Sequence, residues 1–128
     1  MTNKAIIQRL YQSFASGDIQ AVTAAFADDI EWTEADGFRL AGTYIGPQSV
    51  VENVFMRVGE FSENWGVAID RYIADGDTVV ADGKYTWNHK ETGESCKVRM
   101  AHVWTLTDGK AVSFLQHVDT ARVRELIG

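Results

Sequence analysis

The spacing of apolar residues changes once along this chain, near Gly59, and this change constrains the fold more than any other feature. Before Gly59, apolar residues recur at helical spacing in three segments. After it, four segments alternate apolar and polar residues, are rich in β-branched and aromatic types, and are joined by hairpin-like turns. Helices followed by a meander of antiparallel strands predict an α+β fold. We expect three N-terminal helices packed on one strongly curved, mostly antiparallel sheet that forms a cone-shaped pocket.

Capping residues place the boundaries of the predicted helices. Gly17 ends the first helix, and Asp18 is a favourable N-cap for a short second one, which Asp28-Asp29 then breaks. Pro47 follows Gly46 at a first helical position, and Gly59 closes the third helix. The predicted helical ranges are 2–15, 18–26 and 47–59, with a further short helix at 121–127.

Alternation of side chains locates the predicted strands. Gly83 and a bulge near Arg71-Tyr72 are expected to bend the sheet into a cone. The predicted strand ranges are 30–34, 65–74, 78–88, 95–106 and 111–119, while 35–46 is predicted to be a loop.

Length and charge limit the classes of protein to consider. The chain has 128 residues, and we expect a single domain spanning 1–128. The net charge of −6 disfavours nucleic acid and anionic membranes as partners. No apolar run approaches the roughly 20 residues that span a bilayer, and the N-terminus lacks a signal-peptide pattern. Because Cys96 is the single cysteine, no internal disulfide can form. We therefore expect a cytoplasmic protein.

Three polar residues interrupt the apolar alternation on the predicted inner face of the sheet. Glu34 follows Trp32, His102 lies between Met100 and Trp104, and Gln116 lies between Phe114 and Val118. A carboxyl group in an apolar cavity has its pKa raised by desolvation, which suits proton abstraction near neutral pH. A histidine opposite it can act as an acid or donate a hydrogen bond to an enolate oxygen. Glu34 and His102 are therefore the candidate catalytic residues.

Each of these residues also has a purely structural interpretation. A buried histidine is most often a hydrogen-bonded core residue, Glu34 could be a solvated carboxylate at a strand end, and Gln116 could be a structural hydrogen bonder. The large inner residues could form a core or the wall of a pocket. The predicted ligand-binding set is Trp32, Tyr85, Trp87, Met100, Trp104, Phe114 and Gln116. No pair among the three histidines and the cysteine is spaced for chelation on one face, so we expect no metal and no cofactor.

Several phrases of the sequence resemble a known family. They are Phe26-Ala27-Asp28-Asp29-Ile30-Glu31-Trp32, the helix opening Gly42-Thr43-Tyr44-Ile45-Gly46-Pro47, the run from His102 to Lys110, and the closing Val118-Asp119-Thr120. Together these phrases resemble the SnoaL-like polyketide cyclase and ketosteroid-isomerase-related family of the nuclear-transport-factor-2-like superfamily. The resemblance covers nearly the whole chain, and it implies a cystatin-like α+β barrel and a homodimer.

The resemblance also implies roles for individual residues. Matching the isomerase pattern places the carboxylate base at Glu34 and an oxyanion donor at His102. The isomerase tyrosine matches a position near Leu10, with Tyr11 one residue away. In the cyclases a histidine and an aspartate from two late strands act together. His102 matches that histidine, whereas Gln116 faces it, and Asp119 could substitute only beyond a bulge.

Two functions remain open from the sequence. The first is a proton-transfer enzyme of the isomerase, cyclase or dehydratase type, acting on a small apolar carbonyl compound. The second is a ligand-binding or dimerisation module of the same fold without catalysis. We expect a homodimer through the outer sheet face, which carries Lys84, Thr86, Asn88, Arg99, Ala101 and Val103.

Overall fold

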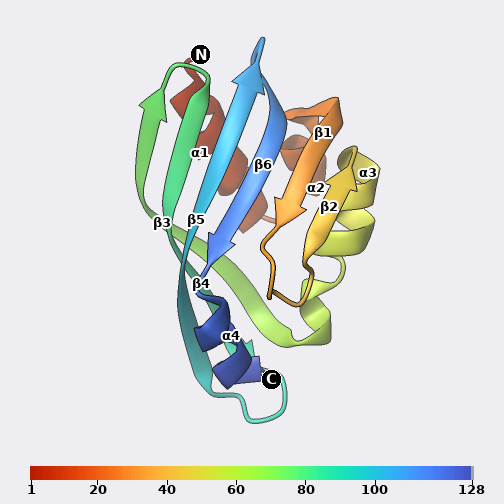
Figure 1. Ribbon diagram of the computed structural model, residues 1–128, viewed down its shortest axis with the longest axis vertical. Helices are drawn as coiled ribbons and strands as arrows, with labels where there is room; N and C mark the ends of the chain where they lie inside the picture. The colour runs from red at the N-terminus through yellow and green to blue at the C-terminus, as the bar shows by residue number, and fades with distance from the viewer. Residues whose placement is uncertain (128) are drawn as a thin grey trace.

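The computed structural model describes residues 1–127 and shows helices packed against a six-stranded sheet (Figure 1). The sheet order is β2-β1-β6-β5-β4-β3, and every pairing is antiparallel except the parallel pair of β1 and β6. The elements are α1 (Asn3–Ala15), α2 (Ile19–Ala24), β1 (Phe26–Glu34), β2 (Gly42–Ile45), α3 (Pro47–Val50), η1 (Val51–Phe55), η2 (Val58–Glu60), β3 (Ser62–Asp75), β4 (Thr78–His89), β5 (Ser95–Thr107), β6 (Lys110–Val118) and α4 (Thr120–Ile127). The predicted α+β class is confirmed.

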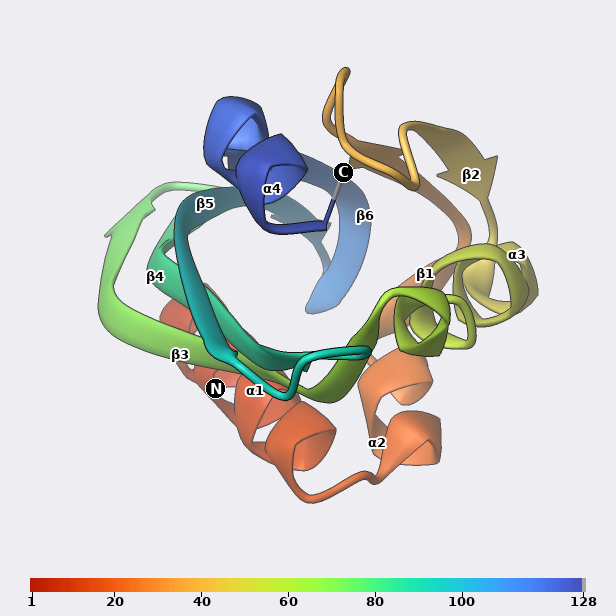
Figure 2. The ribbon, with the colours of Figure 1, turned by 90° about the horizontal axis from the view of Figure 1, so that it is seen from below.

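The long strands curl so that the sheet wraps around its inner face. Viewed from below, β3, β4, β5 and β6 form an arc, with α1 and α2 on one side and α3 and η1 beside β1 (Figure 2). The inner positions of β4 and β5 are buried in strict alternation, as their sequence pattern predicts. The sheet thus presents one apolar face to a central space bordered by the helices.

The predicted helix boundaries hold at both ends of α1 and at the start of α2. The Thr2 and Asp18 side chains cap the two helices by accepting hydrogen bonds from Ala5 N and Ala21 N. The predicted continuation of α2 to Phe26 is wrong. Phe26 begins β1 and pairs with Ala111, so Asp28-Asp29 lies within the strand, where the pairing register shifts. Phe26 has the spacing of a helical residue relative to Ile19 and Val22, but it pairs with β6 in the sheet instead.

Two further predictions need correction. The predicted loop 35–46 contains β2, which pairs with the end of β1 and extends the sheet at its edge. The predicted third helix begins at Pro47 as expected, but it continues after Val50 as a π-helical turn, η1, and then as the 3₁₀ turn η2. π-Helical turns often occur at functional sites, and η1 delivers side chains to the cavity described below.

Gly83 allows β3 to approach β4 closely at the bend of the sheet. A Cβ atom at this position would lie 2.0 Å from the carbonyl oxygen of Ala68, which no side-chain movement can relieve. The register of β3 also shifts between Ile69 and Arg71, next to the predicted bulge. A glycine and a bulge thus act together to curve the sheet.

We expect Gly83→Ala to destabilise the protein by about 3 kcal/mol, because the added methyl group must push two backbones apart. Gly59→Ala is the matched control, since nothing lies within 4 Å of a Cβ at that position. Chemical denaturation of both variants measures the difference. Equal stabilities would show that the close approach at Gly83 does not require glycine.

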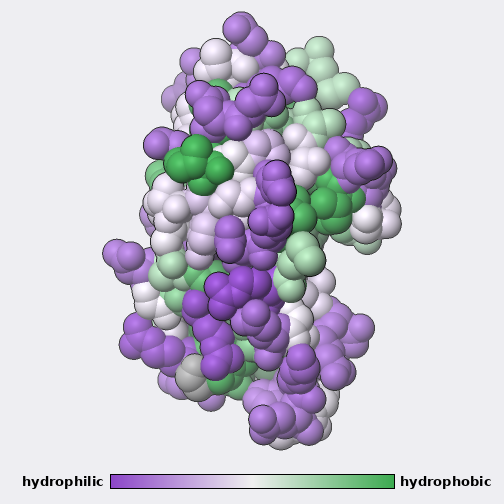
Figure 3. All heavy atoms as spheres, turned by 90° about the vertical axis from the view of Figure 1, so that its right-hand side faces the viewer, coloured by the Kyte–Doolittle hydropathy of each residue, from purple (hydrophilic) through white to green (hydrophobic). Residues whose placement is uncertain are grey.

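Within residues 1–127, no helix combines the length and the apolar character needed to cross a membrane. Figure 3 shows the side of the molecule formed by β2 and α3, and this side is mostly hydrophilic with separate apolar patches.

Candidate functional site

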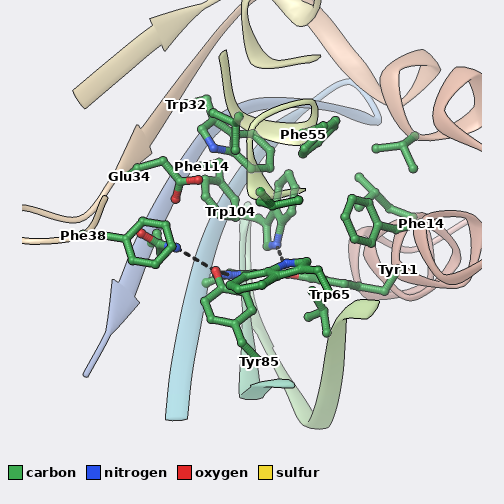
Figure 4. A pocket seen from close by; sticks show the side chains of 17 residues that line it. Tyr11, Phe14, Trp32, Glu34, Phe38, Phe55, Trp65, Tyr85, Trp104 and Phe114 are labelled. Atoms are coloured by element: carbon green, nitrogen blue, oxygen red, sulfur yellow. Dashed lines mark hydrogen bonds between the residues drawn. The ribbon is translucent and has the colours of Figure 1, made fainter. Parts of the chain in front are cut away.

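A narrow cavity of about 50 Å³ lies between the inner face of the sheet and the helices. Its wall is almost entirely apolar and aromatic, with a few polar groups that converge on the interior (Figure 4). Such a combination is typical of small-molecule sites. Glu34 and His102 both line this cavity, so the structure brings the two candidate residues together.

Glu34 is the acidic residue of the cavity wall. Its position at the end of β1 continues the inward row of Ile30 and Trp32, and only 4 % of its surface is exposed. Its Oε2 atom is buried and has no hydrogen-bond partner. Burial raises the pKa of the Glu34 carboxyl to about 8, and the neighbouring Trp32 indole opposes this shift without reaching hydrogen-bond geometry. A carboxyl group held in this way titrates in the range useful for proton transfer.

Both ring nitrogens of His102 form hydrogen bonds with tyrosine hydroxyls. Its Nδ1 lies 2.5 Å from the hydroxyl oxygen of Tyr11, and its Nε2 lies 2.6 Å from that of Tyr85. Burial lowers the pKa of the imidazole to about 3, so the ring is neutral near pH 7. Because both nitrogens are occupied, a ligand would meet His102 through the tyrosines rather than directly.

Two further side chains hold the tyrosines. The Trp104 indole N–H donates to the Tyr11 hydroxyl at 2.9 Å, and the Gln116 amide donates to the Tyr85 hydroxyl at 2.8 Å. Gln116 in turn accepts a hydrogen bond from the backbone N–H of Ala35, next to Glu34. These side chains and His102 form one connected network, in which Glu34 Oε2 and the Trp32 indole N–H take no part.

Stacked aromatic rings fix the wall beside Glu34. Trp32 lies on Phe114 with ring centroids 3.6 Å apart and an interplanar angle of 14°, as the register of β1 on β6 dictates. Trp104 packs edge-on against both rings. The predicted wall residues Trp32, Tyr85, Trp104, Phe114 and Gln116 all line the cavity.

Two predicted wall residues do not line the cavity. Trp87 has the inward parity but lies near the hairpin end of β4, where it pairs with Cys96 and stacks on Trp65. Met100 is buried between Gly83 and Val118, at the end of β6 that leads into α4. Parity identifies the face of a strand but not the position along it, so parity alone cannot separate these two residues from the cavity wall.

Sequence reasoning did not assign several wall residues. Tyr11 lies one residue away from the position that the family resemblance implies, yet it reaches His102 from α1. Phe38 lies in the segment predicted as a loop, and its burial at 5 % exposure is signalled only by its apolar type among glycines and polar residues. The remaining unassigned wall residues are Leu10, Phe14, Val22, Val54, Phe55, Val58, Trp65 and Val67.

The other polar candidates lie elsewhere. Asp119 is exposed and accepts a hydrogen bond from Arg122 N at the start of α4, so it does not pair with His102. His89 accepts hydrogen bonds within the turn after β4, and His117 is exposed on β6. No group of three or more His, Cys, Asp or Glu side chains in the described part of the chain could hold a metal ion.

The family model of the SnoaL-like domain matches residues 7–114, which include most of α1 and the whole of five of the six strands. The chain belongs to the SnoaL-like family. Its aromatic cavity, Glu34 and the His102 network therefore lie in a SnoaL-like domain. No protein of curated function matches the chain.

Solved structures extend this SnoaL-like assignment. An NTF2-like protein from Burkholderia thailandensis is 38% identical, with a TM-score of 0.94, and the match covers 100% of this chain and 98% of that one. An NTF2-like protein of unknown function from Burkholderia pseudomallei is 31% identical, with a TM-score of 0.90 and coverage of 99% and 98%. TerC, co-crystallised with polyporic acid, is 28% identical, with a TM-score of 0.89 and coverage of 98% and 97%.

Proposed function

We propose that this SnoaL-like protein catalyses proton transfer on a small, flat, largely aromatic carbonyl compound, with Glu34 as the base. The observation that carries the proposal is the Glu34 carboxyl oxygen, which is buried in the cavity wall without a hydrogen-bond partner. Leaving a buried polar atom unpaired costs about 1–3 kcal/mol. A ligand that supplies a partner would recover this cost.

The chemistry follows from the positions of the polar groups. The Glu34 carboxylate removes a proton from the carbon next to the ligand carbonyl, and the electron pair of the broken C–H bond moves into an enolate. A tyrosine hydroxyl of the His102 network donates a hydrogen bond to the enolate oxygen. The protonated Glu34 then returns the proton to the same or another carbon, so the protein is unchanged at the end. The step uses only side chains of the cavity.

The ligand class follows from the wall. Its rings can stack on the aromatic side chains, and its oxygens can accept hydrogen bonds from a tyrosine hydroxyl and from the Trp32 indole N–H, which has no partner. Polyporic acid, the compound crystallised with TerC, is an aromatic hydroxyquinone and has both features. Because TerC is 28% identical to this chain and was crystallised with polyporic acid, that structure supports an aromatic carbonyl compound as the ligand class.

A second candidate function is ligand binding without catalysis. The observation that favours it is the occupation of both His102 nitrogens by tyrosines, which leaves the ring no free polar edge. In that case the Glu34 carboxyl, with its pKa of about 8, would mostly stay protonated at pH 7 and donate a hydrogen bond to the ligand.

The two functions are separated by following 2-tetralone, a bicyclic aromatic ketone, in deuterium oxide by NMR. The proposed enzyme speeds deuterium incorporation next to the carbonyl beyond the rate in buffer. If 2-tetralone binds but exchanges only at the rate measured in buffer, the result would support ligand binding without catalysis. Neither binding nor exchange, for 2-tetralone and polyporic acid alike, would contradict the proposed ligand class.

We also propose a homodimer formed through the outer face of the sheet. Cross-strand pairing aligns Ile73, Val80, Val103 and Leu115 in one apolar row across β3, β4, β5 and β6. Ile73 is 50% exposed and Leu115 42% exposed in the single chain. An exposed apolar row flanked by polar residues is typical of a protein interface.

Sedimentation at micromolar concentration should show a dimer, and Leu115→Glu should shift it to the monomer because a charge would be buried in the interface. Met56→Glu is the control, since Met56 is 71% exposed and lies outside the row. A monomeric wild-type protein would rule out this interface.

A further inference from the structure

The hydrogen bonds around His102 determine how many protons the network can offer to a ligand. The direction of two hydrogen bonds in this network is certain, because an indole N–H and a backbone N–H can only donate. Trp104 therefore donates to Tyr11. Ala35 N donates to the Gln116 carbonyl oxygen, so the Gln116 amide nitrogen must face Tyr85 and donate to it. Each tyrosine oxygen thus accepts one fixed N–H.

The remaining protons belong to Tyr11, Tyr85 and the neutral His102 ring. The two hydroxyls and the ring together carry three protons, and the two hydrogen bonds to Nδ1 and Nε2 use two of them. One hydroxyl proton is always left over. If the ring proton is on Nε2, Tyr11 donates to Nδ1 and the Tyr85 proton is free. If the ring proton is on Nδ1, the Tyr11 proton is free instead.

The surroundings of the two tyrosines differ. Among residues 1–127, the Glu34 Oε2 atom is the one buried side-chain oxygen without a partner. Burial, and next the Glu34 carboxylate, raise the pKa of the Tyr85 hydroxyl, whereas the neighbours that act on Tyr11 are Trp104 and Tyr72. Glu34 and Tyr85 face the same part of the cavity (Figure 4). Glu34 Oε2 accepts no hydrogen bond from Tyr85 in the structure, but the nearby carboxyl group favours the arrangement in which the free hydroxyl proton is on Tyr85. Tyr11 has the uncharged Tyr72 side chain as its neighbour instead.

We propose that Tyr85 donates the hydrogen bond to the ligand oxygen and that His102 is a positioning residue, which holds its proton on Nε2 so that the Tyr85 hydroxyl proton is free. This inference rests on the proposed function for the role of the ligand, but the position of the proton is a property of the protein alone. The resulting site places a base, Glu34, and a donor, Tyr85, beside one another. His102 itself touches no reacting atom.

The position of the ring proton can be measured by nitrogen-15 NMR of histidine-labelled protein without ligand. His89→Asn and His117→Gln assign the His102 signals by difference, since the chain has three histidines. We expect a protonated Nε2 and an unprotonated Nδ1 between about pH 5 and pH 8. A proton on Nδ1, or protons on both nitrogens, would overturn the inference whether or not the protein is an enzyme.

The role of Tyr85 is tested with 2-naphthol, a stable aromatic mimic of the tetralone enol. Tyr85→Phe should weaken its binding by about tenfold, and Tyr11→Phe by less. Tyr44→Phe is the control, because the Tyr44 hydroxyl donates to Leu40 O and lies outside the cavity wall. A larger loss in Tyr11→Phe than in Tyr85→Phe would overturn the inference. Failure of 2-naphthol to bind the wild-type protein would instead count against the proposed ligand class, and the NMR measurement would still decide the proton position.

Discussion

Glu34→Gln should lower the rate of deuterium exchange into 2-tetralone by about a thousandfold, because it removes the proposed base and leaves its shape unchanged. The amide has no lone pair that can take up a proton at neutral pH. The apolar wall and the His102 network should remain, so 2-tetralone should still bind. The effect would therefore fall on turnover rather than on binding.

Glu31→Gln is the matched control for this variant. It makes the same chemical change three residues earlier on β1, at an exposed position outside the cavity wall. Its exchange rate should equal that of the wild-type protein. Equal loss of activity in both variants would point to damage of the strand, and full activity in Glu34→Gln would remove Glu34 from the mechanism.

The free energy of unfolding should depend on pH in a way that identifies both buried groups. Folding raises the pKa of Glu34 from its ordinary value of 4.5 to about 8, so its contribution to stability is complete below about pH 4.5 and is lost as pH rises toward 8. Folding lowers the pKa of His102 from 6.5 to about 3, so its contribution is complete above about pH 6.5 and is lost as pH falls toward 3. Between about pH 4.5 and 6.5 the two opposite slopes cancel.

Glu34→Gln should remove one of these slopes. Relative to the wild-type protein, the variant should gain on the order of 4 kcal/mol in unfolding free energy between about pH 4.5 and pH 8.5. Urea denaturation of the wild-type protein, Glu34→Gln and Glu31→Gln at several pH values measures this gain. Parallel stability curves for the wild-type protein and Glu34→Gln would mean that Glu34 titrates at an ordinary pKa in the folded protein.

The sheet and the inward direction of its side chains could be predicted from local sequence. The alternation in β4 and β5 is local information, since each strand repeats apolar residues at every second position. Alternation in 30–34 places Glu34 on the inner face, and alternation in β5 places His102 there. The path of 26–45 could not be predicted in this way, because β1 pairs in parallel with β6, about 80 residues away in sequence, and β2 forms only on the edge that β1 provides.

The partners of His102 were beyond the reach of sequence reasoning for a related reason. Tyr11 comes from α1 and Tyr85 from β4, and only the packing of α1 across the sheet brings the two hydroxyls to one ring. The helical spacing places Tyr11 on the apolar face of α1 but cannot show what that face meets. The sequence therefore predicts the histidine as a candidate acid, whereas in the structure both of its nitrogens have hydrogen-bond partners and a carboxyl oxygen of Glu34 has none.

If Glu34 is a base whose pKa the cavity raises, the pH dependence of 2-tetralone exchange by the wild-type protein will show its titration. We expect the protein-dependent exchange rate, divided by protein concentration, to rise about tenfold per pH unit as the carboxylate forms. This rate should level off near pH 8. His102 should add no second step in this range, because it stays neutral. A rate that is already level at pH 6, or that equals the buffer rate at every pH, would contradict this role of Glu34.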